Sequence, residues 1–155
     1  MDIIYIKGDA TSPIAPNNKV ITHICNDIGG WGKGFVLALS KKWKVAEEAY
    51  RQWHRSQEGF SLGTVQFVKV ADDIFVANMI GQQGIYKDNK GLPPIRYEAV
   101  RECLKEVALF ATKHEASVHM PRIGCGLAGG KWELIEKIIK EELIAKGIAV
   151  TVYDL

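Results

Sequence analysis

The chain has 155 residues, of which 47% are hydrophobic and 25% charged, and its formal net charge is +2 at pH 7. This composition is typical of a globular domain with one hydrophobic core, and it excludes a disordered chain. The small net charge gives no electrostatic ground for a nucleic-acid or membrane partner. No apolar run approaches the roughly 20 residues that span a bilayer.

The cysteines and the N-terminal residues indicate a cellular compartment. Cys25, Cys103 and Cys125 are odd in number and far apart in the sequence, as expected of reduced thiols. The opening residues MDIIYIKGDA lack the basic lead and the cleavage pattern of a signal peptide. We therefore expect a cytoplasmic protein. The histidines lack metal-ligand spacing, so we expect no metal and no cofactor.

Hydrophobic periodicity and turn residues predict strands and helices in alternation along the chain. The predicted strands cover residues 2–7, 19–25, 63–70, 73–80, 116–121 and 148–155, and the predicted helices cover residues 35–56, 95–115 and 131–147. The third and fourth strands are joined by the short turn ADD, which predicts a hairpin. Gly147 is the predicted stop of the last helix.

This order of elements predicts an α/β domain over residues 1–155, built as a three-layer α/β/α sandwich with a mixed central sheet. In such sheets, ligands bind in a crevice at the carboxyl ends of the strands. Two glycine-rich loops, residues 29–34 and residues 124–130, each follow a predicted strand and precede a predicted helix. We call them the first and second glycine loops. Their positions predict that both border this crevice.

A glycine loop between a strand and a helix exposes backbone N–H groups and a helix N-terminus to an anion. One such loop is equally typical of a tight turn, but two converging loops suit a ligand with two phosphates. The first loop is not a P-loop, because Phe35 stands where the hydroxyl residue is needed, and it is a poor match to G-x-G-x-x-G. These mismatches disfavour ATP hydrolysis and a Rossmann-type NAD site.

Several polar and aromatic residues near the strand ends have two interpretations each. Asp9 either begins a turn or accepts hydrogen bonds from the amine of a base. Asn26 either binds a sugar hydroxyl or bonds the loop amides, and His23 is either a core residue or a general base. Trp31, Phe35 and Tyr153 either stack on a base or ribose or belong to the core.

A long polar loop over residues 81–94 is a further candidate for function. Lys87, Lys90 and the neighbouring Arg96 either meet a phosphate or a modified protein, or are simply solvated.

Five segments resemble, in order, the landmarks of the macrodomain family: YIKGDA, HICNDIGGWGKGFVLAL, NMIGQQ, MPRIGCGLAGGKW and VTVYDL. The chain most resembles the small single-domain branch of ADP-ribose-1″-phosphate phosphatases and terminal ADP-ribose glutamyl-hydrolases. The resemblance implies that the ligand is ADP-ribose or an ADP-ribosyl derivative, with an ADP-ribosylated protein as a further candidate partner. A membrane or nucleic-acid partner is not expected, and we expect a monomer.

The resemblance also implies roles for residues. Asp9 would recognise the adenine amino group, Asn26 and the first glycine loop would line the distal ribose, and the second loop would wrap the diphosphate with its amides. Tyr153 would border the adenine. The implied ligand-binding residues are Gly8, Asp9, Ala10, His23, Asn26, Gly30, Trp31, Gly32, Lys33, Gly34, Pro121, Ile123, Gly124, Cys125, Gly126, Leu127, Ala128 and Tyr153. The implied catalytic residues are His23, Asn26 and Asp27.

The chain departs from the glutamyl-hydrolase branch at two places. That branch has a lysine after the strand that matches IFVANMI and an aspartate directly after GCGL, where this chain has Gln82 or Gln83 and Ala128. An amide cannot form a Schiff base, and alanine has no acid-base chemistry.

The sequence leaves more than one function open. The HICN segment matches the phosphatase-like branch and supplies His23 to activate a water, with Asp27 as helper. The alternatives are an ADP-ribose binding module without catalysis and, less favoured, another nucleotide-binding α/β protein that uses NAD.

Overall fold

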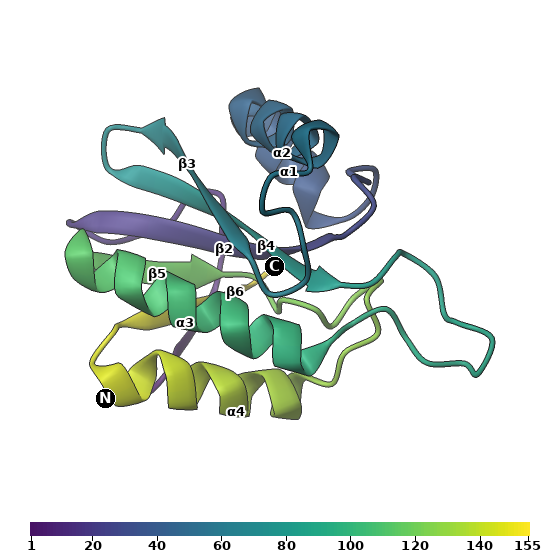
Figure 1. Ribbon diagram of the computed structural model, residues 1–155. Coiled ribbons are helices and arrows are strands. Elements are labelled where there is room, and N and C mark those ends of the chain that lie inside the picture. Colours follow the sequence, from purple (N-terminus) through teal and green to yellow (C-terminus); the bar gives the residue numbers. More distant parts are fainter.

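A six-stranded sheet forms the middle layer of the computed structural model, which describes residues 1–155 (Figure 1). Its strands are β1 (Ile4–Lys7), β2 (Asn18–Asn26), β3 (Val65–Ala71), β4 (Ile74–Gln82), β5 (Ala116–Met120) and β6 (Val150–Asp154). The spatial order is β1-β6-β5-β2-β4-β3, and only β3 is antiparallel to its neighbour. The sheet is therefore mixed, as predicted, and the carboxyl ends of five strands meet at one edge.

Helices cover both faces of the sheet, which confirms the three-layer α/β/α sandwich (Figure 1). One face carries α1 (Phe35–Lys42) and α2 (Lys44–Ser56). The other face carries α3 (Tyr97–Lys113), α4 (Trp132–Glu142) and a short 3₁₀ turn over Ile144–Lys146. No helix is long and apolar enough to cross a bilayer.

The core is divided by the sheet into two unequal parts. A cluster of 23 buried residues packs α3 and α4 against the sheet, whereas 9 buried residues lie under α1 and α2. The central strands β2 and β4 are buried on both faces, and β4 is apolar over most of its length, whereas β2 also buries Lys19, Thr22 and His23. Most of the stabilisation by apolar burial therefore comes from the α3 and α4 side.

The single helix predicted over residues 35–56 is wrong, because the chain breaks at Trp43 into α1 and α2. Trp43 has extended backbone angles (φ −142°, ψ 91°), and its N–H still donates to Leu39 O at 2.7 Å. Its half-buried ring packs against the smaller cluster, and Lys42 Nζ lies 4.9 Å from the ring centroid. Tertiary packing thus turns the chain at a residue whose local sequence carries no helix breaker.

Other predicted boundaries differ by a few residues. The strand predicted from Gly63 begins at Val65, because Gly63 has a φ of +89°, outside the extended region. The last helix ends at Glu142 instead of continuing to Gly147. Gly147 instead closes the 3₁₀ turn with a left-handed backbone (φ 78°), which explains why the sequence carries a stop signal there.

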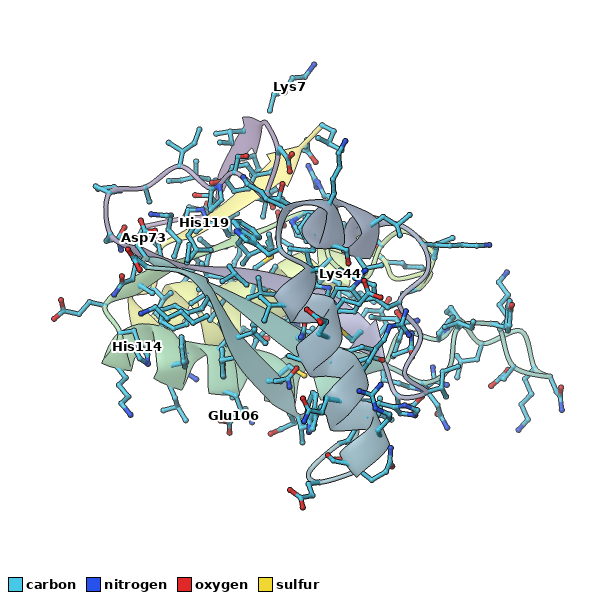
Figure 2. All side chains as sticks on the ribbon, turned by 90° about the horizontal axis from the view of Figure 1, so that it is seen from above. Lys7, Lys44, Asp73, Glu106, His114 and His119 are labelled. Carbon is cyan, nitrogen blue, oxygen red and sulfur yellow. The ribbon has the colours of Figure 1, made fainter.

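The segment from residue 8 to residue 17 crosses the sheet on the same side as α1 and α2, and His119 lies beside it (Figure 2). Lys42 Nζ holds this segment to α1 by donating to Thr11 O at 2.5 Å and to Ser12 Oγ at 2.8 Å. The Ile14 N–H donates to the Tyr153 hydroxyl at 2.9 Å. These bonds fix the backbone that follows Asp9.

Candidate functional site

A cavity of about 200 Å³ lies at the carboxyl ends of β2 and β5, between the two glycine loops. It is lined by His23, Ile24, Lys33, Gly34, Phe35, Val36, Gln82, Pro121, Arg122, Ile123, Gly124, Gly126, Leu127 and Ala128. Small-molecule pockets are commonly about 300–1,000 Å³. A ligand of nucleotide size must therefore extend beyond this cavity along the edge of the sheet.

Asn26 organises the first glycine loop. Its Oδ1 accepts the N–H groups of Ile28 at 3.1 Å and Gly30 at 2.9 Å, and its Nδ2 donates to Gly30 O at 2.9 Å. The Tyr50 hydroxyl donates to Asn26 O at 2.6 Å and lies 3.1 Å from Oδ1. Of the two roles open at the sequence level, the structure shows the bonding of loop amides.

Both glycine loops present backbone N–H groups that have no acceptor within the protein. In the first loop and the start of α1, these include the amides of Gly32, Lys33, Gly34, Phe35 and Val36. In the second loop they are the amides of Gly124, Gly126, Leu127 and Ala128. Unpaired amides that border one cavity from two sides form a site for an anionic group, and the α1 N-terminus adds its dipole.

The second loop keeps its shape through its own backbone. The Gly130 N–H donates to Gly124 O at 2.7 Å, and the Gly129 N–H donates to Gly126 O at 3.1 Å. Ile95 N–H, from the chain before α3, donates to Ala128 O at 3.1 Å. A Cβ on Gly124 (φ 73°) would come within 2.8 Å of Ile95, so glycine is needed both for the angle and for the close packing.

Asp9 and Tyr153 lie at the β1 and β6 side of the same edge. Asp9 Oδ1 accepts from the Thr11 N–H at 2.8 Å and the Thr11 hydroxyl at 2.7 Å, and these bonds lower the pKa of the carboxyl. Asp9 is exposed, and its Oδ2 has no partner within the protein. Its carboxylate is thus fixed as part of a turn and still has an oxygen that can accept a bond from an amine.

Tyr153 lies beneath the backbone of Gly8, and it is a core residue in the structure. Its hydroxyl is 2.7 Å from His119 Nδ1, and Ser117 Oγ is 2.7 Å from His119 Nε2. Burial of the ring raises the pKa of the Tyr153 hydroxyl. A Cβ added to Gly8 would be 3.4 Å from the Tyr153 ring, so the ring borders the Asp9 turn from below.

His23 lines the cavity, but only 2% of its surface is exposed. Asn78 Nδ2 donates to Gln66 Oε1, which leaves Asn78 Oδ1 to accept from His23 Nε2 at 2.5 Å. This arrangement assigns the proton to Nε2 and leaves the lone pair on Nδ1, which is 4.0 Å from Cys25 Sγ. Burial lowers the pKa of His23 to about 4, so the ring is neutral.

Asp27 faces away from the first glycine loop and toward the long loop after β4. Its Oδ1 accepts the Gly84 N–H at 2.8 Å, and its own N–H donates to Gln82 O at 3.1 Å. The structure therefore places Asp27 as the link between the first glycine loop and the segment after β4.

The remaining predicted residues have different surroundings. Trp31 is buried against His23 and Tyr50, and its Nε1–H donates to Ser40 Oγ at 2.7 Å. Ala10 is buried and Leu127 is exposed at the cavity rim. Cys125 is half-buried, its Sγ lies 3.4 Å from Ile123 O, and burial raises the pKa of its thiol.

Arg122 is a cavity residue that the sequence analysis missed. It forms a bidentate pair with Asp154 at 2.9 Å for both bonds, and its guanidinium lies 4.9 Å from the ring centroids of Tyr5 and Trp132. Its position two residues before the second glycine loop was the available signal. Its partners come from both ends of the chain, so nothing local indicated the pairing.

Solved structures share this fold over the whole chain. A protein of unknown function from Bacteroides thetaiotaomicron is 79% identical, the match covers 100% of this chain and 99% of that one, and the TM-score is 0.99. A macrodomain protein from Streptomyces coelicolor is 52% identical over 99% of each chain, with a TM-score of 0.89. This chain therefore belongs to the macrodomain family. No protein-family model matches the sequence.

Curated relatives are more distant. The chain is 31% identical to the mouse chromodomain-helicase-DNA-binding protein 1-like, and the match covers 97% of this chain but only 17% of that protein. The match to the zebrafish protein of the same name covers 15% of that protein. The ADP-ribose 1″-phosphate phosphatase of Lodderomyces elongisporus is 27% identical over 90% of this chain and 91% of its own length. A bovine ADP-ribose glycohydrolase is 28% identical, over 99% of this chain and 91% of its own length. The chain thus spans about a sixth of the helicases and nearly all of the two enzymes.

Proposed function

We propose that this protein binds ADP-ribose along the carboxyl edge of the sheet and hydrolyses a bond at the distal ribose of an ADP-ribosyl derivative. The observation that carries the proposal is the pair of glycine loops whose unpaired amides border one cavity. Two amide groups on opposite sides suit a diphosphate, which has an anionic phosphate for each loop.

The order of the strands gives the ligand a direction. Asp9 follows β1, the second glycine loop follows β5, and the first glycine loop follows β2, so they succeed one another across the sheet. Adenine at Asp9, diphosphate between the loops and distal ribose near the first loop is the arrangement that this order supports. The names of the phosphatase and glycohydrolase relatives, which are similar over nearly their whole lengths, agree with this ligand.

His23 is the proposed base for the hydrolytic step. A neutral imidazole with its proton on Nε2 has a lone pair on Nδ1 that can take a proton from a water. Asn78 would keep the ring in this tautomer, much as a carboxylate orients a histidine in other hydrolases. Hydrolysis would divide one water between the two products. When the bond from the ribose oxygen to a phosphorus or acyl carbon breaks, the departing group takes the hydroxyl and the ribose oxygen takes the proton; when the bond from the ribose carbon to the departing oxygen breaks, the ribose takes the hydroxyl and the departing group takes the proton.

A binding module without catalysis is the second candidate. It is favoured by Ala128 and by Gln82 and Gln83, which supply no nucleophile or acid at the positions where the glutamyl-hydrolase branch has them. The side chains of Asn26 and Asp27, both predicted to be catalytic, are also engaged by the backbone of the neighbouring loops.

Calorimetric titration with ADP-ribose, AMP and NAD tests the binding. We expect micromolar affinity for ADP-ribose, about 8 kcal/mol, and much weaker binding of AMP, which lacks the diphosphate and the distal ribose. Equal affinity for AMP and ADP-ribose would contradict the assignment of the two loops.

Turnover is tested with His23→Ala on ADP-ribose-1″-phosphate, O-acyl-ADP-ribose and an ADP-ribosylated protein. We expect the variant to lose turnover by about 100-fold or more, the usual contribution of a general base, while its ADP-ribose affinity stays within a few-fold. Cys25→Ser is the control, because it changes the neighbour of His23 Nδ1 but leaves the ring. Unchanged turnover in His23→Ala would remove His23 from the mechanism, and no turnover by the native protein would favour the binding module.

A further inference from the structure

An arm formed by residues 83–94 projects from the body of the protein after β4 (Figure 1). The arm is closed at its base, where the Gln83 N–H donates to Pro94 O at 2.9 Å and Gln82 pairs with Ile95. Arg96 Nη1 donates to Pro93 O at 2.6 Å and to Pro94 O at 3.1 Å. The base of the arm is therefore fixed to the sheet.

The tip of the arm is also ordered by hydrogen bonds. Asp88 Oδ1 accepts the N–H groups of Lys90 at 2.8 Å and Leu92 at 2.9 Å. The Asp88 N–H donates to Leu92 O, and the Gly91 N–H donates to Asp88 O, each at 3.0 Å. A tip shaped in advance loses little conformational entropy when it binds a partner.

The side chains of the arm are unusual for a solvated loop. Tyr86 is 81% exposed, Leu92 52% and Ile85 40%, and the lysines Lys87 and Lys90 are exposed beside them. Tyrosine is enriched at protein interfaces, where its large amphipathic ring gives contact area at low entropic cost. Tyr86 is thus almost free of intramolecular packing, and Leu92 and Ile85 are only partly covered.

The arm stands at the end of the candidate site that lies opposite Asp9. Across the sheet the order is β1, β6, β5, β2 and β4, so the arm follows the strand next to the first glycine loop. Its base lies against the second loop, where a Cβ added to Gly129 would be 2.7 Å from Pro93, and its Gly84 N–H donates to Oδ1 of Asp27, two residues before the first loop. A group attached to the far end of a ligand that starts at Asp9 would therefore lie on the side of the site where the arm stands.

We propose that the arm binds the protein that carries an ADP-ribosyl group, at an acidic and apolar stretch beside the modified residue. The proposal rests on the proposed function and deepens it, because it makes the substrate a protein-linked ADP-ribose. Ile85, Tyr86 and Leu92 would contact apolar side chains of the carrier, and Lys87 and Lys90 would pair with its carboxylates.

A nucleic-acid carrier fits the arm less well than a protein does. Two lysines and one aspartate give the arm a net charge of +1, which is weak attraction for a polyanion whose binding depends on many phosphate contacts. The arm has one aromatic ring, whereas its two aliphatic side chains have no stacking role with bases. Apolar groups with a modest positive charge match an acidic and apolar peptide.

The test compares dissociation constants measured by calorimetry for free ADP-ribose and for two short synthetic peptides that carry ADP-ribose through a non-hydrolysable link. In one peptide the modified residue is flanked by Glu and Leu, and in the other by Gly and Ser; an ADP-ribosylated oligonucleotide is the third conjugate. The native protein is compared with a Tyr86→Ser/Leu92→Ser variant. Leu109→Ser is the matched control, because Leu109 is an exposed leucine on α3.

We expect the Glu/Leu peptide to bind the native protein and Leu109→Ser about tenfold more tightly than free ADP-ribose does. The Tyr86→Ser/Leu92→Ser variant is expected to lose this gain and to keep its affinity for free ADP-ribose. The proposal is overturned if the gain is absent, survives in the double variant, or is larger for the oligonucleotide. If free ADP-ribose does not bind the native protein, the proposed function falls as well, so the two failures are distinguishable.

Discussion

Gly130 carries the most severe steric constraint in the candidate site. A Cβ at this position would lie 2.4 Å from Gly124 O, the same oxygen that accepts the Gly130 N–H. Because the obstacle is backbone, Gly130→Ala must displace the second glycine loop. We expect a loss of about 1–3 kcal/mol in the free energy of unfolding and at least about a tenfold loss in ADP-ribose affinity. Urea unfolding and calorimetry measure these two effects.

Gly126→Ala is the control for this prediction. Gly126 lies in the same loop, and a Cβ added to it would meet no atom within 4 Å; its φ is also not positive. We expect the free energy of unfolding of this variant to stay within about 0.5 kcal/mol of the native value. Equal stability of the two variants would show that the loop adjusts without cost and that its backbone is not fixed by the Gly124–Gly130 contact.

The sequence located the candidate site but did not distinguish between the roles of single residues. The strand, glycine loop and helix pattern placed both loops at the correct edge, since that pattern is local. Whether Asn26 meets a sugar or the loop amides depends on its bonds with Gly30 and with Tyr50 of α2, and the second of these is a tertiary contact. The pairing of Arg122 with Asp154 was not predictable for the same reason.

At the scale of the elements, α1 connects the first glycine loop with the segment after β1. Lys42, in the last turn of α1, bonds Thr11 O and Ser12 Oγ, two and three residues after Asp9. We expect Lys42→Ala to release this segment and to weaken ADP-ribose binding by about three- to tenfold, because Asp9 would lose a fixed position. Calorimetry measures the loss, with AMP as a second ligand because it retains the adenine.

Lys41→Ala is the matched control, because Lys41 is exposed, lies next to Lys42 on α1 and forms no hydrogen bond or ion pair. It removes the same charge from the same helix and should leave the affinity unchanged. If both variants bind ADP-ribose equally weakly, the loss of affinity comes from the change in net charge, and the bonds from Lys42 to the segment after β1 contribute nothing to binding.

The elements themselves were largely predictable, because periodicity reports burial. Strands β2 and β4 are buried on both faces and carry short apolar runs rich in β-branched residues, and α3 has apolar residues at helical spacing. The break at Trp43 was not predictable, since helical periodicity continues through it. The fixed shape of the arm was also not predictable from the sequence, because Asp27 and Arg96, which lie outside the arm, hold its base.

At the scale of the whole molecule, two buried histidines link stability to pH. His23 and His119 are 2% and 1% exposed, and burial lowers the pKa of each from 6.5 to about 4. In the unfolded chain both rings take up a proton below about pH 6.5, whereas the folded protein stays neutral until about pH 4. The unfolded state therefore binds more protons in this window, and the free energy of unfolding falls as the pH is lowered through it.

We expect each histidine to account for a loss of up to about 3 kcal/mol between pH 6.5 and pH 4. Carboxyl groups with a lowered pKa, such as those of Asp9 and Asp154, lose their contribution to the free energy of unfolding only at lower pH. The effect of the histidines is therefore separate from the effect of the carboxyl groups. Urea unfolding between pH 7 and pH 5 gives the slope, which His119→Gln should roughly halve whatever its effect on stability at pH 7. An unchanged slope in this variant would mean that His119 takes up its proton equally in the folded and the unfolded protein, which its burial argues against.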